Sequence, residues 1–126
     1  MTKNNLTFVH LTDLHVGDPS VPDEHLYSDT RATLRNILAD IKRIRPVPSF
    51  VVASGDLTNR GDVASYRLFK EIVEEAGLTM PMLLALGNHD TRPGFYEAML
   101  GRTADNLAPY DHDAVIDGLH LIVIDT

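Results

Sequence analysis

The chain has 126 residues, of which 44% are hydrophobic and 23% are charged. This length corresponds to roughly one domain, and the composition is that of a globular protein rather than a disordered or collagen-like one. The absence of cysteine excludes a disulfide framework, a cysteine-type zinc finger and a cysteine nucleophile. A net charge of −7 argues against nucleic acid as a partner.

The N-terminal residues lack the basic and apolar regions of a signal peptide. The longest apolar runs, 82–86 and 119–124, are too short to span a membrane. We therefore expect a cytoplasmic protein without a membrane partner. The sequence carries no pattern that predicts an oligomeric state.

The first predicted strand covers residues 6–11, where apolar and polar residues alternate up to Thr12. A helix is expected next, with Ser28 and Asp29 as candidate caps and Pro46 as its stop. The apolar positions of this helix are Leu34, Ile37, Leu38, Ile41 and Ile44.

Two nearly continuous apolar runs, 49–53 and 82–86, are typical of strands buried on both faces at the centre of a parallel sheet. Between them, Asp62 can cap a helix that ends before Gly77. The apolar stripe of that helix is Tyr66, Phe69, Ile72, Val73 and Ala76. Both helices are predicted to be crossover connections.

A third helix is expected to begin at Pro93 and to stop at Gly101. Residues 113–116 and 119–124 then flank the pair 117–118, Asp-Gly, which favours a type I′ hairpin turn. The alternation of strands and helices predicts an α/β fold with a parallel sheet.

Polar motifs follow the three predicted parallel strands, at residues 13–15, 55–61 and 87–90. Loops after parallel strands gather along the carboxyl edge of the sheet, where ligands bind. Each motif alone also fits a turn or a helix cap built from Gly, Asn and Asp. Because they occupy equivalent loops, the three motifs together predict one shared metal site.

The residue types in these motifs suit metal chemistry. Asp13 and His15 are one residue apart, so in an extended segment both side chains leave the same side and can share an ion. Asp56 could bridge two cations, and Asn88 offers an amide oxygen. His89 can face a substrate, with its neighbour Asp90 available to fix the tautomer of the ring.

The order Asp-x-His, Gly-Asp-x-x-Asn and Gly-Asn-His-Asp, beginning at Asp13, Gly55 and Gly87, resembles the calcineurin-like metallophosphoesterase superfamily. The residues around the motifs, 54–61 and 86–90, are similar to those of the bacterial branch of this superfamily, the cyclic-nucleotide and glycerophosphodiester phosphodiesterases. The resemblance implies an αββα sandwich, of which this sequence supplies mainly the first sheet with its helices. It also implies hydrolysis of cyclic nucleotides or small phosphodiesters.

The resemblance implies a binuclear site of two divalent ions, Mn, Fe or Zn, that lower the pKa of a water molecule and orient a phosphate. Asp13 and His15 would bind the first ion, Asp56 would bridge both ions, and Asn88 would bind the second. His89 would contact the phosphate or assist the leaving group as a catalytic residue, with Asp90 behind it.

Members of the superfamily add three more metal-binding histidines from later Gly-His and His-x-His segments, which these 126 residues do not contain. We expect ordinary structural or surface roles for the other histidines, His10, His25, His112 and His120. Residues 1–126 are accordingly expected to be the N-terminal part of a longer metallophosphoesterase domain.

Three alternatives remain open at this stage. One is a non-catalytic binding or structural module of the same fold. The second is the protein phosphatase branch, which is disfavoured because its members usually have Asp where this chain has Asn59 and Glu where it has Asp90. The third is the DNA nuclease branch, whose second motif ends differently from Thr58-Asn59.

Overall fold

The computed structural model describes residues 5–17 and 29–126. The elements, in chain order, are β1 (Phe8–Leu11), α1 (Thr30–Ile41), β2 (Phe50–Ser54), α2 (Val63–Ala76), β3 (Met82–Ala85), α3 (Arg92–Leu100), β4 (His112–Ile116) and β5 (Leu119–Val123).

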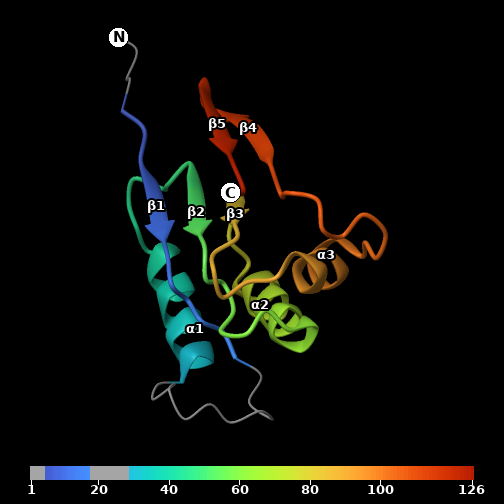
Figure 1. Ribbon diagram of the computed structural model, residues 1–126. Helices are drawn as coiled ribbons and strands as arrows, with labels where there is room; N and C mark the ends of the chain where they lie inside the picture. The colour runs from blue at the N-terminus through green and yellow to red at the C-terminus, as the bar shows by residue number, and fades with distance from the viewer. Residues whose placement is uncertain (1–4, 18–28) are drawn as a thin grey trace.

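The first three strands form a parallel sheet in the order β1-β2-β3, and α1 and α2 cover one of its faces (Figure 1). The predicted α/β class and both crossover helices are confirmed. The expectation that residues 82–86 lie at the centre of the sheet is wrong for the described residues. Among the strands of the described residues, only β2 has neighbours on both sides in this sheet, and most of β3 is half-buried.

The helices begin and end largely where capping chemistry predicts. The Asp29 carboxylate accepts a main-chain N–H of α1 at 3.1 Å, and Asp62 does the same for α2. Gly77 ends α2 in the left-handed conformation, with φ of 63°. The other candidate cap, Ser28, lies outside the described residues.

The first helix ends earlier than its apolar pattern predicts. Ile41 is its last residue and is 3% exposed, whereas Ile44 lies in the following turn and is 36% exposed. The Ile44 N–H bonds to the Ile41 carbonyl, three residues back, which tightens the chain into a turn. Pro46 also disfavours helical geometry at Arg45, so the turn before it cannot extend α1.

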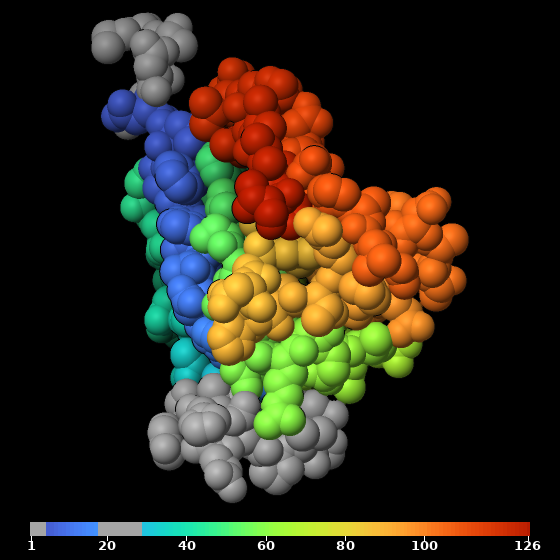
Figure 2. Space-filling model, in the orientation of Figure 1, coloured from blue at the N-terminus to red at the C-terminus, as the bar shows by residue number. Residues whose placement is uncertain are grey.

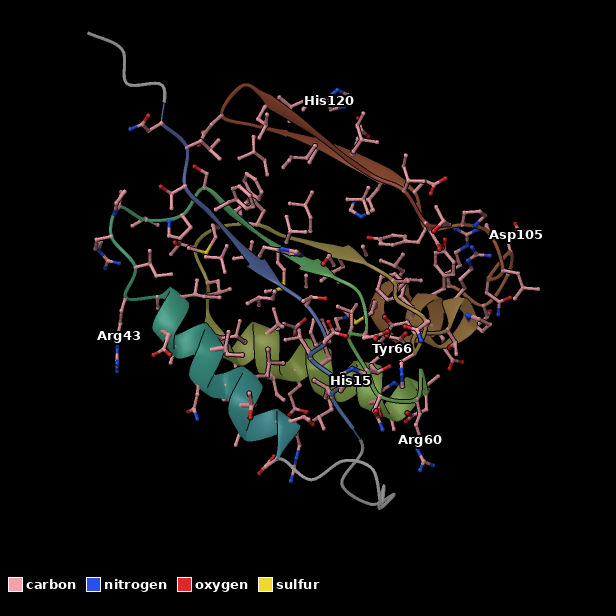
Figure 3. The ribbon with its side chains drawn as sticks, turned by 60° about the vertical axis from the view of Figure 1, so that its left-hand side comes forward. His15, Arg43, Arg60, Tyr66, Asp105 and His120 are labelled. Carbon is pink, nitrogen blue, oxygen red and sulfur yellow. The ribbon has the colours of Figure 1, made fainter. Side chains whose placement is uncertain are left out.

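The hairpin of β4 and β5 lies on the face of the sheet opposite α1 and α2 (Figure 3). Phe50 and Leu83 are buried on this face, separate from the cluster that packs against the helices. Two side chains tie the hairpin to the sheet: Ser49 Oγ donates to Asp117 at 2.6 Å, and His112 Nε2 donates to the Leu84 carbonyl at 2.7 Å. Figure 2 shows the hairpin in red above β2, with β1 left visible along the edge.

The hairpin turn has the predicted type I′ character, because Asp117 and Gly118 both have positive φ, of 52° and 79°. The pairing of β4 with β5 is antiparallel, as expected. Each strand is shifted slightly from its predicted bounds: β4 already includes His112, and β5 ends at Val123 rather than Ile124.

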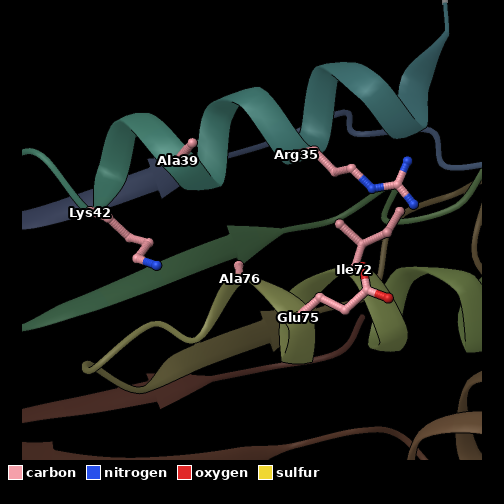
Figure 4. Close-up of a pocket in the computed structure, with 6 residues that line it drawn as sticks. All are labelled: Arg35, Ala39, Lys42, Ile72, Glu75 and Ala76. Atoms are coloured by element: carbon pink, nitrogen blue, oxygen red, sulfur yellow. The ribbon is translucent and has the colours of Figure 1, made fainter.

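A groove of about 260 Å³ lies between α1 and α2 (Figure 4). It is lined by Arg35, Ala39, Lys42, Ile72, Glu75 and Ala76. None of these residues belongs to the three polar motifs, so the groove is separate from the edge of the sheet where the motifs lie. Among residues 5–17 and 29–126, no helix is both long and apolar enough to cross a membrane.

An ion pair fastens the start of α3 to the residues after β5. Arg92 Nε donates to Asp125 Oδ2 at 2.8 Å, and the same oxygen accepts the main-chain N–H of Tyr110 at 2.8 Å. The Asp125 side chain is only 8% exposed. The hydrogen bond from Arg92 holds the pKa of Asp125 below its ordinary value of 3.8.

This pair predicts a pH-dependent stability difference between the native chain and Arg92→Ala. A lowered pKa in the folded state adds stability above pH 3.8, and this stability is lost as the pH falls through the folded-state pKa. Arg92→Ala should therefore melt below the native chain at neutral pH, and the difference in Tm should shrink on acidification to about pH 3. A Tm difference that stays constant over this range in thermal melts would show that the ion pair is not its source.

Candidate metal centre

The three polar loops meet at the carboxyl edge of the sheet, as the strand positions predict. Main-chain bonds join the first loop to the second, from Asp13 N to Gly55 O at 3.1 Å and from His15 N to Asp56 O at 2.9 Å. The third loop is joined to the second by the His89 N–H, which donates to Asp56 Oδ1 at 2.9 Å. The labelled His15 lies beyond the ends of β1 and β2 (Figure 3).

The first loop is not extended. The prediction that extended backbone puts Asp13 and His15 on the same side is therefore wrong. Asp13 and His15 have φ of 58° and 48°, in the left-handed region, and Asp56 joins them at 51°. In the described residues only two other non-glycine residues, Asp105 and Asp117, have positive φ. Left-handed backbone costs conformational free energy in residues other than glycine, and it is concentrated at functional sites. The main-chain bonds to the second loop hold the first loop in this conformation.

The side chains nevertheless converge. His15 Nε2 lies 3.6 Å from Asp13 Oδ1 and 3.7 Å from Asp56 Oδ2. These distances are too long for hydrogen bonds. They approach the separation of two ligands on one ion, since metal–ligand bonds of about 2.1 Å place neighbouring ligand atoms roughly 3–3.5 Å apart. Donor atoms of His15, Asp56 and His89 all lie within 4.8 Å of one another.

The imidazole of His15 is poorly satisfied by the protein itself. Its Nδ1 is buried and has no hydrogen-bond partner in the described part of the chain. Its Nε2 is beyond hydrogen-bond distance of both carboxylates that face it. Nε2 is therefore the nitrogen that a cation held between the two carboxylates would take, and Nδ1 would stay without a partner. With two carboxylates beside it, the donor set fits Mn, Fe or Zn.

Asp56 and Asp13 differ in their surroundings. The Asp56 side chain is 11% exposed and the Asp13 side chain is 62% exposed. The Thr12 hydroxyl donates to Asp13 at 2.9 Å, and this hydrogen bond holds the pKa of Asp13 below its usual range. Asp13 is thus ionised at neutral pH, as a carboxylate ligand must be.

Asn88 lies against Asp56. With its amide nitrogen facing the carboxylate, it donates to Asp56 Oδ1 at 3.2 Å and to Oδ2 at 3.3 Å. Rotation of the amide would present its carbonyl oxygen to a cation held by Asp56. The structure therefore brings Asn88 together with Asp56, as the positions of the second and third loops predict.

His89 has a different orienting partner from the one that sequence suggests. Its Nδ1 lies 2.8 Å from the main-chain carbonyl of Asn59. A carbonyl only accepts, so Nδ1 carries the proton and Nε2 is left for other chemistry. The expectation that Asp90 fixes this tautomer is wrong, because the Asp90 carboxylate bonds elsewhere. The ring of His89 meets that of His15 edge to face, with centroids 4.8 Å apart.

The remaining described histidines make contacts outside this group. His10 bonds to Ser54 Oγ, His112 to the Leu84 carbonyl, and His120 to Asp113. These bonds agree with the ordinary roles expected for them, and the labelled His120 lies on the hairpin, away from His15 (Figure 3). His25 lies outside the described residues.

Gly87 gives Asp56 the space it needs. A Cβ at position 87 would overlap the Asp56 main-chain nitrogen and Oδ1. Gly87→Ala is therefore expected to displace the carboxylate, to lower Mn²⁺ affinity, and to cost about 1–3 kcal/mol of stability through overpacking. Isothermal titration with Mn²⁺ and chemical denaturation measure the two effects.

Gly101→Ala is the matched control for this substitution. Gly101 has φ of 63° and a Cβ there would meet nothing within 4 Å, so alanine strains the backbone without touching the loops. The control should lose stability and keep its Mn²⁺ affinity. Equal Mn²⁺ affinities for the two variants would contradict the steric role of Gly87.

The comparisons with known proteins point to the same chemistry. The family model described as calcineurin-like phosphoesterase matches residues 6–124. Over 123 residues, the chain is 33% identical to a cAMP/cGMP dual specificity phosphodiesterase of Mycobacterium tuberculosis, covering 94% of this chain and 37% of that protein. It is 34% identical over 122 residues to a probable cyclic nucleotide phosphodiesterase of Rhodococcus erythropolis, covering 94% of this chain and 39% of the relative.

Over a shorter stretch of 62 residues, the chain is 37% identical to a probable glycerophosphodiester phosphodiesterase of Arcobacter nitrofigilis. It covers 49% of this chain and 22% of the relative. The chain thus spans well under half the length of each of these curated relatives.

Proposed function

Since this chain belongs to the calcineurin-like phosphoesterase family, we propose that the protein is a metal-dependent hydrolase of small phosphodiesters. The observation that carries the proposal is the arrangement of Asp13, His15 and Asp56. All three have left-handed backbone, and His15 Nε2 lies 3.6 and 3.7 Å from the two carboxylates. Family membership implies divalent metal ions, and these residues form a donor set that suits one.

We assign Asp13 and His15 to a first ion and Asp56 to a bridging position between two ions. Asn88 is assigned to the second ion, because its amide lies against Asp56. When bound, two divalent ions would lower the pKa of a water molecule and stabilise the charge that develops on a phosphate. They would also offset the negative charge of an acidic protein at the point where an anionic substrate binds.

His89 is assigned the catalytic role on the protein side. The Asn59 carbonyl keeps a proton on Nδ1, so proton exchange takes place at Nε2. A proton on Nε2 can be donated to a phosphate oxygen or to the leaving group. Because the Asn59 partner is a main-chain group, the orientation of the ring depends on the fold of the second loop.

The substrate class proposed is cyclic nucleotides and related small phosphodiesters. The support comes from the relatives, which are named as phosphodiesterases for cAMP and cGMP, for cyclic nucleotides or for glycerophosphodiesters. The net charge of −7 favours a small anion neutralised by metal over a long polyanion.

The test is hydrolysis by the Mn²⁺-loaded protein of bis(p-nitrophenyl) phosphate, cyclic AMP and single-stranded DNA. We expect turnover of the first two substrates and its loss after chelation of the metal. Faster hydrolysis of DNA than of cyclic AMP would favour a nuclease instead. No hydrolysis of any substrate by a protein that carries the whole metallophosphoesterase domain, with Mn²⁺ bound, would favour a non-catalytic module of the same fold.

A further inference from the structure

The Asp90 carboxylate accepts five hydrogen bonds beside the candidate metal centre. Its Oδ2 accepts the main-chain N–H groups of Leu57 at 3.1 Å and Gly87 at 2.8 Å. Its Oδ1 accepts the Thr58 N–H at 3.1 Å, the Thr58 hydroxyl at 3.2 Å and the Tyr66 hydroxyl at 2.9 Å. These five bonds join the loop after β2, the loop after β3 and helix α2 at one carboxylate.

The bonded groups lie next to the proposed ligands in the chain. Leu57 directly follows Asp56, and Gly87 directly precedes Asn88. Asp56 has a left-handed backbone with φ of 51°, which the chain would relax if its neighbours were free. Gly87 packs so closely on Asp56 that not even a Cβ would fit between them. The Asp90 carboxylate therefore clamps the main chain on both sides of that close approach.

We propose that Asp90 is a positioning residue that holds Asp56 and Asn88 in metal-binding geometry by anchoring the main chain at Leu57, Thr58 and Gly87. This inference rests on the proposed function. Asp90 then acts on the main chain next to Asp56 and Asn88. It does not act on its sequence neighbour His89, because Nδ1 of that ring is held by the Asn59 carbonyl. The electrostatic reason for an acid at this position is that three main-chain N–H groups converge on it, and an ionised carboxylate accepts all of them.

Asparagine at position 90 would satisfy only part of this network. An amide has one acceptor oxygen and one NH₂ group, which cannot accept. If its oxygen faces Leu57 and Gly87, the NH₂ group faces the Thr58 N–H, while the two hydroxyls can rotate to accept. Asp90→Asn therefore keeps the link between the loops and loses one main-chain bond, whereas Asp90→Ala loses all of them. Asp90→Asn should therefore disturb the two loops less than Asp90→Ala does.

The experiment compares native protein, Asp90→Asn, Asp90→Ala and the core variant Phe69→Leu. Phe69 is 1% exposed in α2 and belongs to the core that packs α2 beneath the sheet, so its truncation lowers stability without removing any of the five bonds to Asp90. Thermal melts establish the stability lost by each variant. Hydrogen exchange of the Leu57, Thr58 and Gly87 amides is measured without metal. Mn²⁺ affinity and the visible absorption bands of bound Co²⁺ then report the site itself.

We expect faster exchange at those amides in both Asp90 variants and not in Phe69→Leu. Mn²⁺ affinity should fall by about tenfold or more in Asp90→Ala, the range seen when supporting partners of metal ligands are removed. Asp90→Asn should lie between Asp90→Ala and the native protein. The Co²⁺ bands should shift in the Asp90 variants and stay native in Phe69→Leu, even though that variant melts earlier.

Two results would overturn the inference while leaving the proposed metal site intact. One is native Mn²⁺ affinity and native Co²⁺ bands in Asp90→Ala despite faster amide exchange, which would make the anchor purely structural. The other is unchanged amide exchange in Asp90→Ala. If the native protein binds Mn²⁺ no better than Asp56→Ala does, the proposed function itself fails and the inference falls with it.

Discussion

Asp56→Ala is expected to weaken Mn²⁺ binding by more than about 100-fold, beyond the usual cost of removing a mere supporting partner of a ligand. Two of the other proposed ligands approach the Asp56 carboxylate: His15 Nε2 lies 3.7 Å from it, and the Asn88 amide lies 3.2 Å from it. The Asp56 side chain is only 11% exposed, so water has little access to replace it as a ligand. Phosphodiester hydrolysis should be lost with the metal.

Asp56→Asn refines this test. The amide can still accept the His89 N–H that the carboxylate accepts at 2.9 Å, so the loops stay joined while the charge is removed. We expect Mn²⁺ affinity to fall in Asp56→Asn as well, because a neutral amide attracts a divalent cation less strongly than a carboxylate does. The measurement is isothermal titration calorimetry, together with the phosphodiester assay.

The matched control is Asp62→Ala. Asp62 is a nearby aspartate whose carboxylate caps α2, at 3.1 Å from the Ser65 N–H. Its loss should cost about 1 kcal/mol of stability through the cap and leave Mn²⁺ affinity unchanged. If Asp62→Ala and Asp56→Ala weakened Mn²⁺ binding equally, the ion would not be bound where we place it.

His89→Ala is expected to lower phosphodiester turnover by about 10²–10⁴-fold, the range for loss of a proton-transfer group. Mn²⁺ affinity should fall much less than in Asp56→Ala, because His89 is assigned to the substrate rather than to an ion. The ring lies close enough to His15 and Asp56 for its donor atom to join them within 4.8 Å. The ratio of the losses in turnover and in affinity therefore decides its role.

The control for His89→Ala is His120→Ala, which removes an exposed imidazole whose partner is Asp113 on the hairpin. It should hydrolyse phosphodiesters at the native rate. If His89→Ala lost as much Mn²⁺ affinity as Asp56→Ala, His89 would be a metal ligand and the catalytic assignment would be wrong.

The parts of the fold that sequence predicts are those with strong local signals. Asp62 and Gly77 mark the ends of α2 because capping and left-handed geometry favour these residue types. The pair 117–118 marks the hairpin turn for the same kind of reason. Convergence of the three loops follows from strand direction alone, since the carboxyl ends of parallel strands share one edge.

Long-range main-chain bonds explain what sequence could not predict. The left-handed backbone at Asp13 and His15 depends on bonds to Gly55 and Asp56, some 40 residues away, and no residue type signals them. The partner of His89 is a main-chain carbonyl, which every residue carries. Asp90 follows His89 in sequence, yet its carboxylate turns toward other main-chain groups, because three N–H donors converge there.

The most direct test of the proposed metal centre is anomalous X-ray diffraction from Mn²⁺-loaded crystals, with data collected on both sides of the manganese absorption edge. We predict an anomalous peak within bonding distance of His15 Nε2 and of a carboxylate oxygen of Asp56. Asp13 should be a further ligand of the same ion. A second peak, if both proposed sites fill, should lie between Asp56 and Asn88. Full Mn²⁺ occupancy at another place, with no peak at His15 and Asp56, would contradict the account.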